Sequence, residues 1–132
     1  MNKLKALSVS AGDPDGIGYD LCVLLFEKHL NYHVHIYGDK KILLSRAKLL
    51  GIKNLRNKKI TIFDVKNNKK IKNKRELVLE SIKSAAEACI QKKSVALVTL
   101  PVNKEKLSTS KIYSLGTLSI SQNFVKLAMS QL

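Results

Sequence analysis

The chain has 132 residues, of which 45% are hydrophobic and 26% charged, and it carries a formal net charge of +14. This length predicts a single domain, residues 1–132, that can bury a core. No apolar run approaches the roughly 20 residues that a membrane-spanning helix needs. The short apolar stretch after Lys3 and Lys5 does not resemble a signal peptide. We therefore expect a cytoplasmic protein.

The positive charge raises the question of nucleic-acid binding. Residues 53–75 contain ten Lys or Arg side chains and one acidic side chain, Asp64. However, all but three of the 24 basic residues are lysines, a bias that AT-rich coding produces. No aromatic residue stands among the lysines of 66–75 to stack on bases. A solvated basic surface therefore explains the charge better than a nucleic-acid site, and it would also attract phosphorylated metabolites.

Short apolar runs alternate with segments of helical periodicity along the chain. The apolar runs predict strands at residues 4–10, 33–37, 60–63 and 95–99. Helical spacing predicts helices at 17–30, 40–50 and 75–91, with weaker signals at 103–107 and 121–131. Strands and helices in this order are typical of βαβ units. We therefore predict an α/β fold with a parallel or mixed sheet flanked by helices.

The residue pattern of the predicted helices indicates which side chains are buried. In helix 17–30, Leu21, Leu24 and Leu25 share one face, with Glu27 and Lys28 outside. Helix 75–91 is the most periodic, with apolar residues at helical spacing: Val78, Ile82, Ala85, Ala86 and Cys89.

The two cysteines and three histidines do not form a recognisable metal site. Cys22 and Cys89 both fall on apolar helix faces, which favours reduced core thiols over a disulfide or metal role. His33 and His35 point to the same face of a predicted strand, but no carboxylate or cysteine lies at ligand spacing. We assign neither metal-binding nor catalytic residues.

The most informative segment is the glycine loop, residues 12–18, which reads Gly-Asp-Pro-Asp-Gly-Ile-Gly between the first strand and the first helix. Such a turn exposes backbone amides at a helix N-terminus, the geometry of an anion or substrate site. Its glycine spacing differs from the dinucleotide fingerprint, and no Gly-Lys-Ser/Thr follows as in a P-loop. An alternative is a plain turn in which Gly16 and Gly18 supply unusual backbone angles and Asp15 caps the helix.

A second loop, residues 100–104, follows the predicted strand 95–99. Ligands of parallel sheets bind at the carboxyl ends of strands. We therefore predict that residues 12–18 and 101–104 lie at one edge of the sheet and face one cleft. The candidate substrate-binding residues are Gly12, Asp13, Gly16, Gly18, Asn103 and Lys104.

Three segments carry a resemblance to a known family. Residues 12–18 match Gly-Asp-Pro-x-Gly-Ile-Gly, with Tyr19-Asp20 in place of Pro-Glu. Residues 37–39 read Tyr-Gly-Asp and precede Leu-Leu-Ser-Arg-Ala-Lys-Leu-Leu-Gly at 43–51. Residues 96–104 read Ala-Leu-Val-Thr-Leu-Pro-Val-Asn-Lys. In this order and spacing, the segments resemble the N-terminal portion of the 4-hydroxythreonine-4-phosphate dehydrogenases of pyridoxal phosphate biosynthesis, over about residues 4–116.

The resemblance implies a two-domain fold like that of isocitrate and isopropylmalate dehydrogenases, of which this chain would supply part of one domain. It implies a homodimer with the active site in a cleft and at the dimer interface. It also implies a phosphorylated small-molecule substrate, NAD or NADP as hydride acceptor, and a divalent metal that polarises the ketone formed.

The chain departs from the family after residue 104. Where the family has Gly-His-Thr-Glu, this sequence has Gly116, Thr117, Leu118 and Ser119. The metal-binding histidines of the family lie further along than Leu132. We therefore expect a truncated or fragmentary homologue that is inactive as an isolated chain. The alternatives are a non-catalytic binding module for phosphorylated metabolites and a basic nucleic-acid-binding domain.

Overall fold

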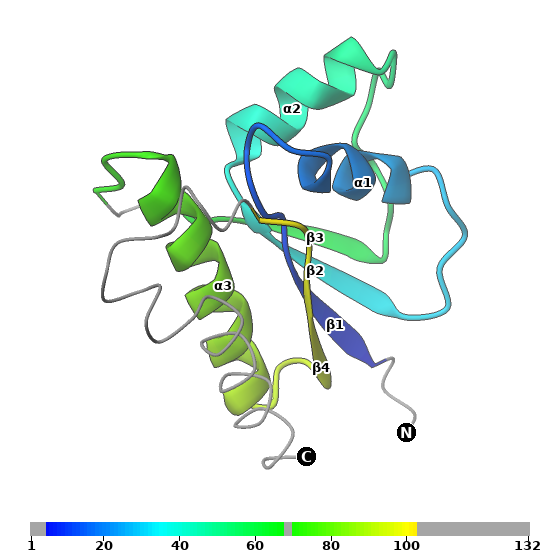
Figure 1. The fold of residues 1–132 in the computed structure, drawn as a ribbon. Helices are drawn as coiled ribbons and strands as arrows, with labels where there is room; N and C mark the ends of the chain where they lie inside the picture. The colour runs from blue at the N-terminus through cyan, green and yellow to red at the C-terminus, as the bar shows by residue number, and fades with distance from the viewer. Residues whose placement is uncertain (1–4, 68–69, 103–132) are drawn as a thin grey trace.

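The structure, a computed structural model, describes residues 5–67 and 70–102 and contains one four-stranded sheet between two layers of helix (Figure 1). The elements follow in the order β1 (Ala6–Ser10), α1 (Gly18–Leu25), β2 (His33–Gly38), α2 (Lys40–Leu49), β3 (Ile60–Asp64), α3 (Lys74–Ile90) and β4 (Ala96–Thr99). All strand pairs are parallel, and the strand order is β3-β2-β1-β4. The predicted α/β class and all four predicted strands are confirmed.

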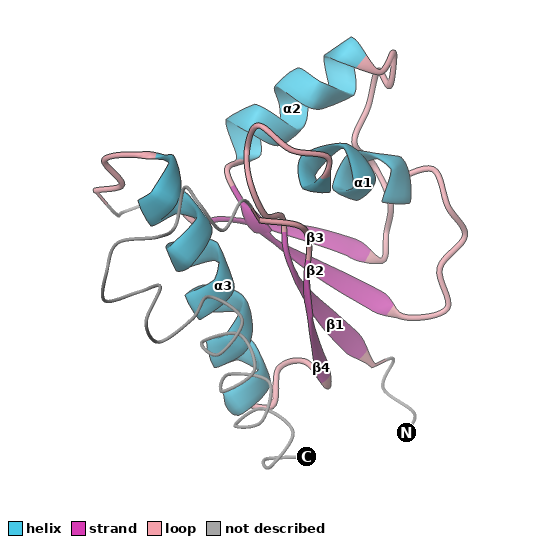
Figure 2. Cartoon of the chain, in the orientation of Figure 1, coloured by secondary structure: helices cyan, strands magenta, loops and turns pink. Residues whose placement is uncertain are grey.

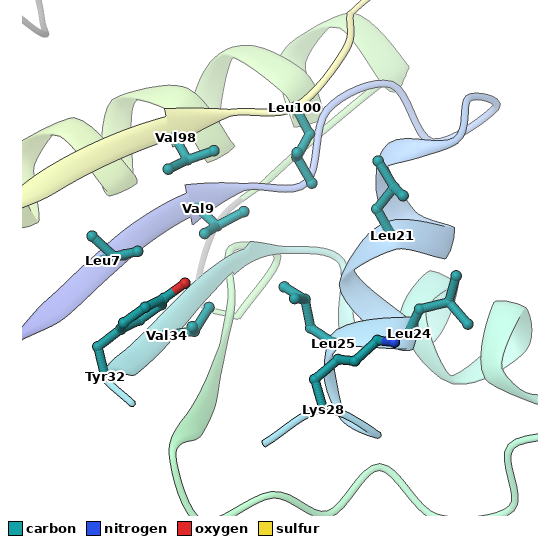
Figure 3. A pocket seen from close by; sticks show the side chains of 10 residues that line it. All are labelled: Leu7, Val9, Leu21, Leu24, Leu25, Lys28, Tyr32, Val34, Val98 and Leu100. Carbon is teal, nitrogen blue, oxygen red and sulfur yellow. The ribbon is translucent and has the colours of Figure 1, made fainter. Parts of the chain in front are cut away.

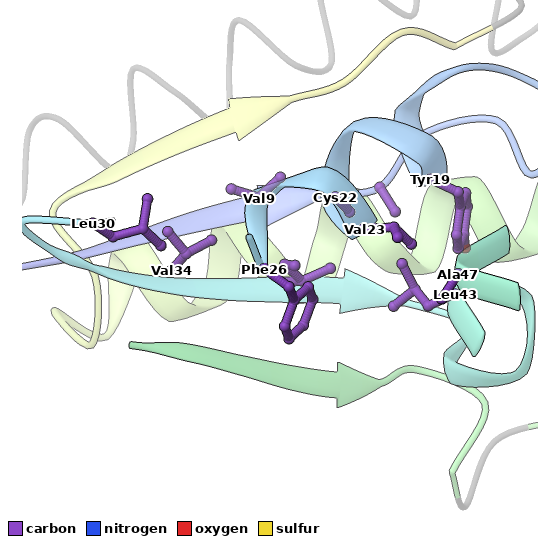
Figure 4. Close-up of a cluster of buried hydrophobic side chains, with 11 residues drawn as sticks. Val9, Tyr19, Cys22, Val23, Phe26, Leu30, Val34, Leu43 and Ala47 are labelled. Carbon is purple, nitrogen blue, oxygen red and sulfur yellow. The ribbon is translucent and has the colours of Figure 1, made fainter. Parts of the chain in front are cut away.

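The two faces of the sheet carry different helices (Figure 2). Side chains of α1 and α2 pack against β1, β2 and β3 in the larger core, which is drawn in Figure 4. Val9, Val34 and Ile36 point into this core from the sheet, and Tyr19, Val23 and Leu43 meet them from the helices. Because strand side chains alternate between faces, Tyr37 and Leu97 point the other way and pack beneath α3.

Helix α3 forms as its periodicity predicts. Asn73 is the N-cap residue, and its side chain accepts a hydrogen bond from the Glu76 amide at 2.9 Å. The five predicted apolar positions of this helix are all buried: Val78, Ile82, Ala85, Ala86 and Cys89.

Both cysteines are free thiols in the core, as expected from their positions. Burial raises the pKa of the Cys22 thiol to about 12. The Cys89 sulfur lies 3.1 Å from the Ser94 hydroxyl, which also contacts the Ser8 hydroxyl on β1.

Helix α1 is shorter than predicted, because it ends at Leu25 instead of near Leu30. The amides of Phe26, Glu27 and Lys28 each bond to a carbonyl three residues earlier, so the helix tightens in its last turn. The Asn57 side chain then donates to the carbonyl oxygens of Phe26 and Lys28 at 3.2 and 3.0 Å. The carbonyl groups after the helix end are therefore hydrogen-bonded by a residue distant in sequence. Helical periodicity cannot predict such a contact.

The buried face of α1 also differs from the prediction. Tyr19, Cys22 and Val23 are fully buried, whereas Leu21 and Leu24 are 40% and 41% exposed. The helix thus carries apolar side chains on both sides, and the structure covers one of them. The predicted helices at 103–107 and 121–131 lie outside the described residues.

Candidate functional site

The glycine loop begins where β1 ends, in a position that β2 and the segment after β4 both fix. The Ala11 amide donates to the Tyr37 carbonyl at 3.0 Å, which continues the sheet by one residue. The Asp13 amide then donates to the Pro101 carbonyl at 3.1 Å. The Leu100 amide donates to the Ser10 carbonyl at 3.1 Å. The described parts of the two predicted loops, residues 12–18 and 100–102, therefore meet at the same edge of the sheet, as expected.

Gly12 and Gly18 are required by close contacts between backbone segments. Gly12 has a φ of +86°, and a Cβ there would lie 2.4 Å from the Pro101 carbonyl oxygen. A Cβ on Gly18 would lie 2.0 Å from the Ala11 carbonyl oxygen and 3.1 Å from the Leu100 Cβ. The start of α1 therefore sits directly on the end of β1.

Gly16 has neither constraint. Its φ is not positive, and a Cβ there would lie 3.4 Å from the Asp13 carbonyl oxygen, an ordinary contact. The alternative in which Gly16 and Gly18 supply unusual backbone angles is wrong, because that conformation belongs to Gly12. Asp15 does not cap α1 either, since the N-cap is Ile17 and no side chain caps it.

Asp13 and Asp15 have distinct contacts. Asp13 is buried, and its Oδ1 accepts the Asp15 amide at 2.9 Å while its carbonyl accepts the Gly16 amide at 2.9 Å. The Asp15 carboxylate pairs with Lys74 Nζ at 2.7 Å, at the start of α3. The amides of Asp13, Asp15 and Gly16 are thus all bonded within the protein. An anion at this loop would therefore have to use other donors, such as nearby lysines.

The second motif, at residues 37–51, contacts the glycine loop and the start of α1. The Arg46 side chain forms an ion pair with Asp20 at 3.0 Å and donates to the Gly16 carbonyl at 3.3 Å. The Tyr19 hydroxyl, which is fully buried, accepts the Asp39 amide at 3.0 Å. Burial raises the pKa of the Tyr19 hydroxyl well above its usual range, so this group remains a neutral hydroxyl.

Asp39 contacts both Tyr19 and a lysine of the basic segment, residues 53–75. Its Oδ1 accepts the Lys41 amide at 2.9 Å and caps α2, and its Oδ2 lies 3.1 Å from Lys66 Nζ. A side chain at position 38 would be crowded, because a Cβ there would lie 3.0 Å from the Tyr19 hydroxyl. The Tyr-Gly-Asp sequence thus positions Tyr19, and through it the start of α1.

All three motifs therefore gather at the carboxyl end of the sheet. Of the candidate residues, Gly12, Asp13, Gly16 and Gly18 lie together there, and Asn103 and Lys104 lie outside the described residues. Residue-by-residue reading of the loop did not identify Arg46, Lys74 or Tyr19 as part of this site. The sequence could have indicated Arg46, because this residue belongs to the second motif. The pairing of Lys74 with Asp15 depends on packing between distant elements.

No group of three His, Cys, Asp or Glu side chains that could hold a metal ion occurs among residues 5–67 and 70–102. Within the same residues, none of the helices is long and apolar enough to span a membrane.

Comparisons with known proteins agree with the motifs. No protein-family model matches the chain. The chain is 34% identical to a 4-hydroxythreonine-4-phosphate dehydrogenase from Wigglesworthia glossinidia brevipalpis, over 88% of this chain and 41% of that protein. It is 31% identical to the protein of the same name from Methylococcus capsulatus, over 83% of this chain and 39% of the relative. The chain thus spans about two-fifths of the length of these curated relatives.

Two solved structures share the fold. A 4-hydroxythreonine-4-phosphate dehydrogenase from Burkholderia phymatum matches 80% of this chain with a TM-score of 0.65, at 21% identity, and 39% of that protein is covered. A protein described as a putative 4-hydroxythreonine-4-phosphate dehydrogenase from Salmonella typhimurium matches with a TM-score of 0.60, also at 21% identity. These structures contain the same arrangement of strands and helices as part of a longer chain.

Proposed function

We propose that this chain, which corresponds to the N-terminal portion of the 4-hydroxythreonine-4-phosphate dehydrogenase family, supplies one part of the substrate site of such an enzyme. The observation that carries the proposal is the convergence of the three motifs. The Asp13 amide bonds to the Pro101 carbonyl of the third motif, and the Gly16 carbonyl accepts a bond from Arg46 of the second. In open parallel sheets, ligands bind at this edge.

In the proposed reaction, the secondary alcohol of 4-phosphohydroxy-L-threonine is oxidised. NAD or NADP would accept the hydride, and a divalent metal would polarise the resulting ketone. The described residues do not fit a metal site, because no suitable group of ligands gathers among them. We therefore assign the metal ligands of the proposed reaction to polypeptide outside the described residues, and we expect no turnover by this chain alone.

The role proposed for this chain is to bind and orient the phosphorylated substrate. In this proposal the glycine loop forms one side of the substrate site. Its aspartates and three of its amides are already bonded within the protein, so they hold the shape of the loop. Positive charge nearby comes from Lys66 and Lys74, although each is paired with a carboxylate. Lys104 follows Pro101 closely in sequence, so its ammonium group is our candidate for pairing with the substrate phosphate.

The test combines this chain with the part of a relative that lies outside their matched region. The chain and the C-terminal three-fifths of the Wigglesworthia protein are mixed with substrate, NAD and Mg²⁺ or Zn²⁺, and NADH is followed by absorbance. We expect turnover from the mixture, none from the chain alone, and at least a tenfold loss with Lys104→Met. Lys111→Met, at another lysine of the same terminal region, is the matched control.

Other outcomes would favour a different function. Binding of inorganic phosphate by the chain without turnover in any mixture would favour the non-catalytic binding module. Clear turnover by the chain alone, surviving chelator controls and repeated purification, would contradict the assignment of catalysis to the missing part.

A further inference from the structure

The edge of the sheet at β3 carries two adjoining hollows, with volumes of about 480 and 410 Å³. They are lined by α2, by the segment 51–56 that follows it and by β3, which Figure 1 shows at the edge of the sheet. Leu44, Lys53 and Leu55 line both hollows, so the two form one surface, which we call the β3-edge cleft. Among the described residues, none of the glycine loop or of 100–102 lines it, so the cleft is separate from the candidate substrate site.

The floor of the cleft is apolar, because β3 ends the sheet. In the order β3-β2-β1-β4, one backbone edge of β3 has no strand partner among the described residues. Ile60 and Ile62 of this strand are only partly buried, and they both pack against the larger core and line the cleft. Leu55 does the same, and Leu44 is 49% exposed beside it. A hydrocarbon group that covered these side chains would remove apolar surface from water, which is favourable.

The rim of the cleft is positively charged. Lys40, Lys53 and Arg56 line the first hollow, and Lys48 lines the second. All four side chains are exposed, and none of them forms an ion pair within residues 5–67 and 70–102. No Asp or Glu stands among the described residues that line the cleft. Lys74 of the candidate site, by contrast, pairs with a carboxylate at 2.7 Å. The positive charge of the cleft is therefore not compensated by the described part of the chain.

The combination of an apolar floor and a basic rim distinguishes the cleft from two simpler kinds of surface. A solvated basic surface needs lysines, but it needs no leucine and isoleucine side chains between them. A site for single-stranded nucleic acid offers aromatic rings for stacking, whereas Phe26, the aromatic residue that lines the cleft, is 7% exposed. Small-molecule sites are concave and mostly apolar, with volumes of about 300–1,000 Å³ and a few polar groups that orient the ligand. The cleft fits this last description, and its charged groups favour an anion.

We propose that the β3-edge cleft binds an anionic amphiphile, a molecule with a phosphate or carboxylate head and a hydrocarbon tail. The head pairs with Lys53 and Arg56, because charge-assisted hydrogen bonds to oxyanions are stronger than neutral ones. The tail lies against Leu44 and Ile62. The ligand comes either from solution or, as a lipid, from a membrane surface, and both sources share this chemistry. The site goes beyond the proposed function, since it neither uses the substrate site nor takes part in the reaction.

The first experiment measures the binding of three probes to the full chain by isothermal titration calorimetry at low salt. Octyl phosphate has both halves of the proposed ligand, inorganic phosphate has only the head, and octanol has only the tail. We expect octyl phosphate to bind at least tenfold more tightly than either of the others, since the cleft contacts both halves. Equal binding of octyl phosphate and one of the partial probes, or no binding of octyl phosphate, would overturn the proposal.

Two matched pairs of variants locate the bound probe. Lys53→Met should weaken the binding of octyl phosphate at least fivefold, whereas Lys83→Met, at an exposed lysine of α3 outside the cleft, should change it less than twofold. Leu44→Asn should also weaken binding at least fivefold. Its control is Leu49→Asn, because Leu49 is 74% exposed on the same helix and lines neither hollow. Circular dichroism confirms that each variant folds, and a cleft variant that binds as tightly as its control would contradict the proposed site.

Vesicles distinguish the two sources of the ligand. The chain is sedimented with vesicles that mix phosphatidylglycerol and phosphatidylcholine, and with vesicles of phosphatidylcholine alone. Sedimentation with the anionic vesicles that Lys53→Met and Leu44→Asn both reduce supports the site with a lipid as its ligand. Absence of sedimentation, or sedimentation that both substitutions leave unchanged, supports a soluble ligand wherever the octyl phosphate result holds.

Discussion

The two faces of the sheet differ most clearly across β1 and β4. Beneath α3, apolar side chains of the helix are buried against the sheet, with Leu77 at 2% exposure. On the other face, the apolar groove lined by Leu21, Leu24 and Val98 leaves Leu24 at 41% exposure (Figure 3). Both helices have apolar residues at helical spacing, so the difference does not come from the local sequence. Among the described residues, α3 therefore covers its face of the sheet more completely than α1 covers the opposite face.

The largest expected effect comes from the contact that places α1 on its face of the sheet. Gly18→Ala should destabilise the fold by more than about 3 kcal/mol, because the new Cβ would meet the Ala11 carbonyl, a backbone atom that cannot move freely. Urea unfolding followed by circular dichroism measures the change. Gly16→Ala is the control and should stay within about 1 kcal/mol of the parent. Similar losses in both variants would contradict the assigned roles.

The next prediction compares the two faces directly. Leu77→Ala should cost about 2–5 kcal/mol, since it leaves a cavity between α3 and the sheet. Leu24→Ala should cost about 0.5 kcal/mol, because the side chain is already half in solvent. The measurement is again urea unfolding, on the chain without any added polypeptide. A large loss for Leu24→Ala would mean that the groove is already filled.

A smaller effect is expected at the end of α1. Asn57→Ala removes two hydrogen bonds to the Phe26 and Lys28 carbonyls and should cost about 1–2 kcal/mol. Thermal unfolding measures this loss. Hydrogen exchange should show faster opening at residues 26–30, while α3 stays protected. Uniform loss of protection across the sheet would contradict this local role.

The smallest effect concerns His35, on the strand next to β3. Burial, together with the nearby His33, lowers the pKa of His35 below its usual value of 6.5. The folded state therefore binds a proton less readily than the unfolded state. Stability should be full above about pH 6.5 and fall as the pH decreases.

His35→Gln should reduce this loss. The test is the unfolding midpoint at pH 5 to 8, where the variant and parent should run parallel above pH 7 and diverge below pH 6.5. Parallel curves throughout would show that His35 does not titrate with folding.

The sequence predicted the strands well because each is a short apolar run between turn residues. It predicted α3 to within one residue at each end because the apolar spacing of that helix is regular. It missed the end of α1, which depends on Asn57, and the exposure of Leu21 and Leu24, which depends on what covers the helix. Periodicity identifies an apolar face but does not identify its partner.

For the candidate site, the sequence located the two loops but not their internal bonds. It predicted their common edge, because parallel strands end on the same side. The alternative of a plain turn gave the unusual backbone angles to Gly16 and Gly18. Gly12 adopts the positive φ instead, where its backbone lies against Pro101. The roles of Arg46 and Lys74 required contacts between elements that are distant along the chain.

The bond between the Asp13 amide and the Pro101 carbonyl also has a consequence for the order of folding. The glycine loop is synthesised early, but its closing partner is near the end of the described chain. During synthesis, β1 and α1 leave the ribosome long before Pro101 does. Because such distant contacts form late and slowly, the loop should reach its final shape in the last step of folding, together with β4. A ribosome-bound intermediate that ends before residue 96 would carry the motif without its geometry.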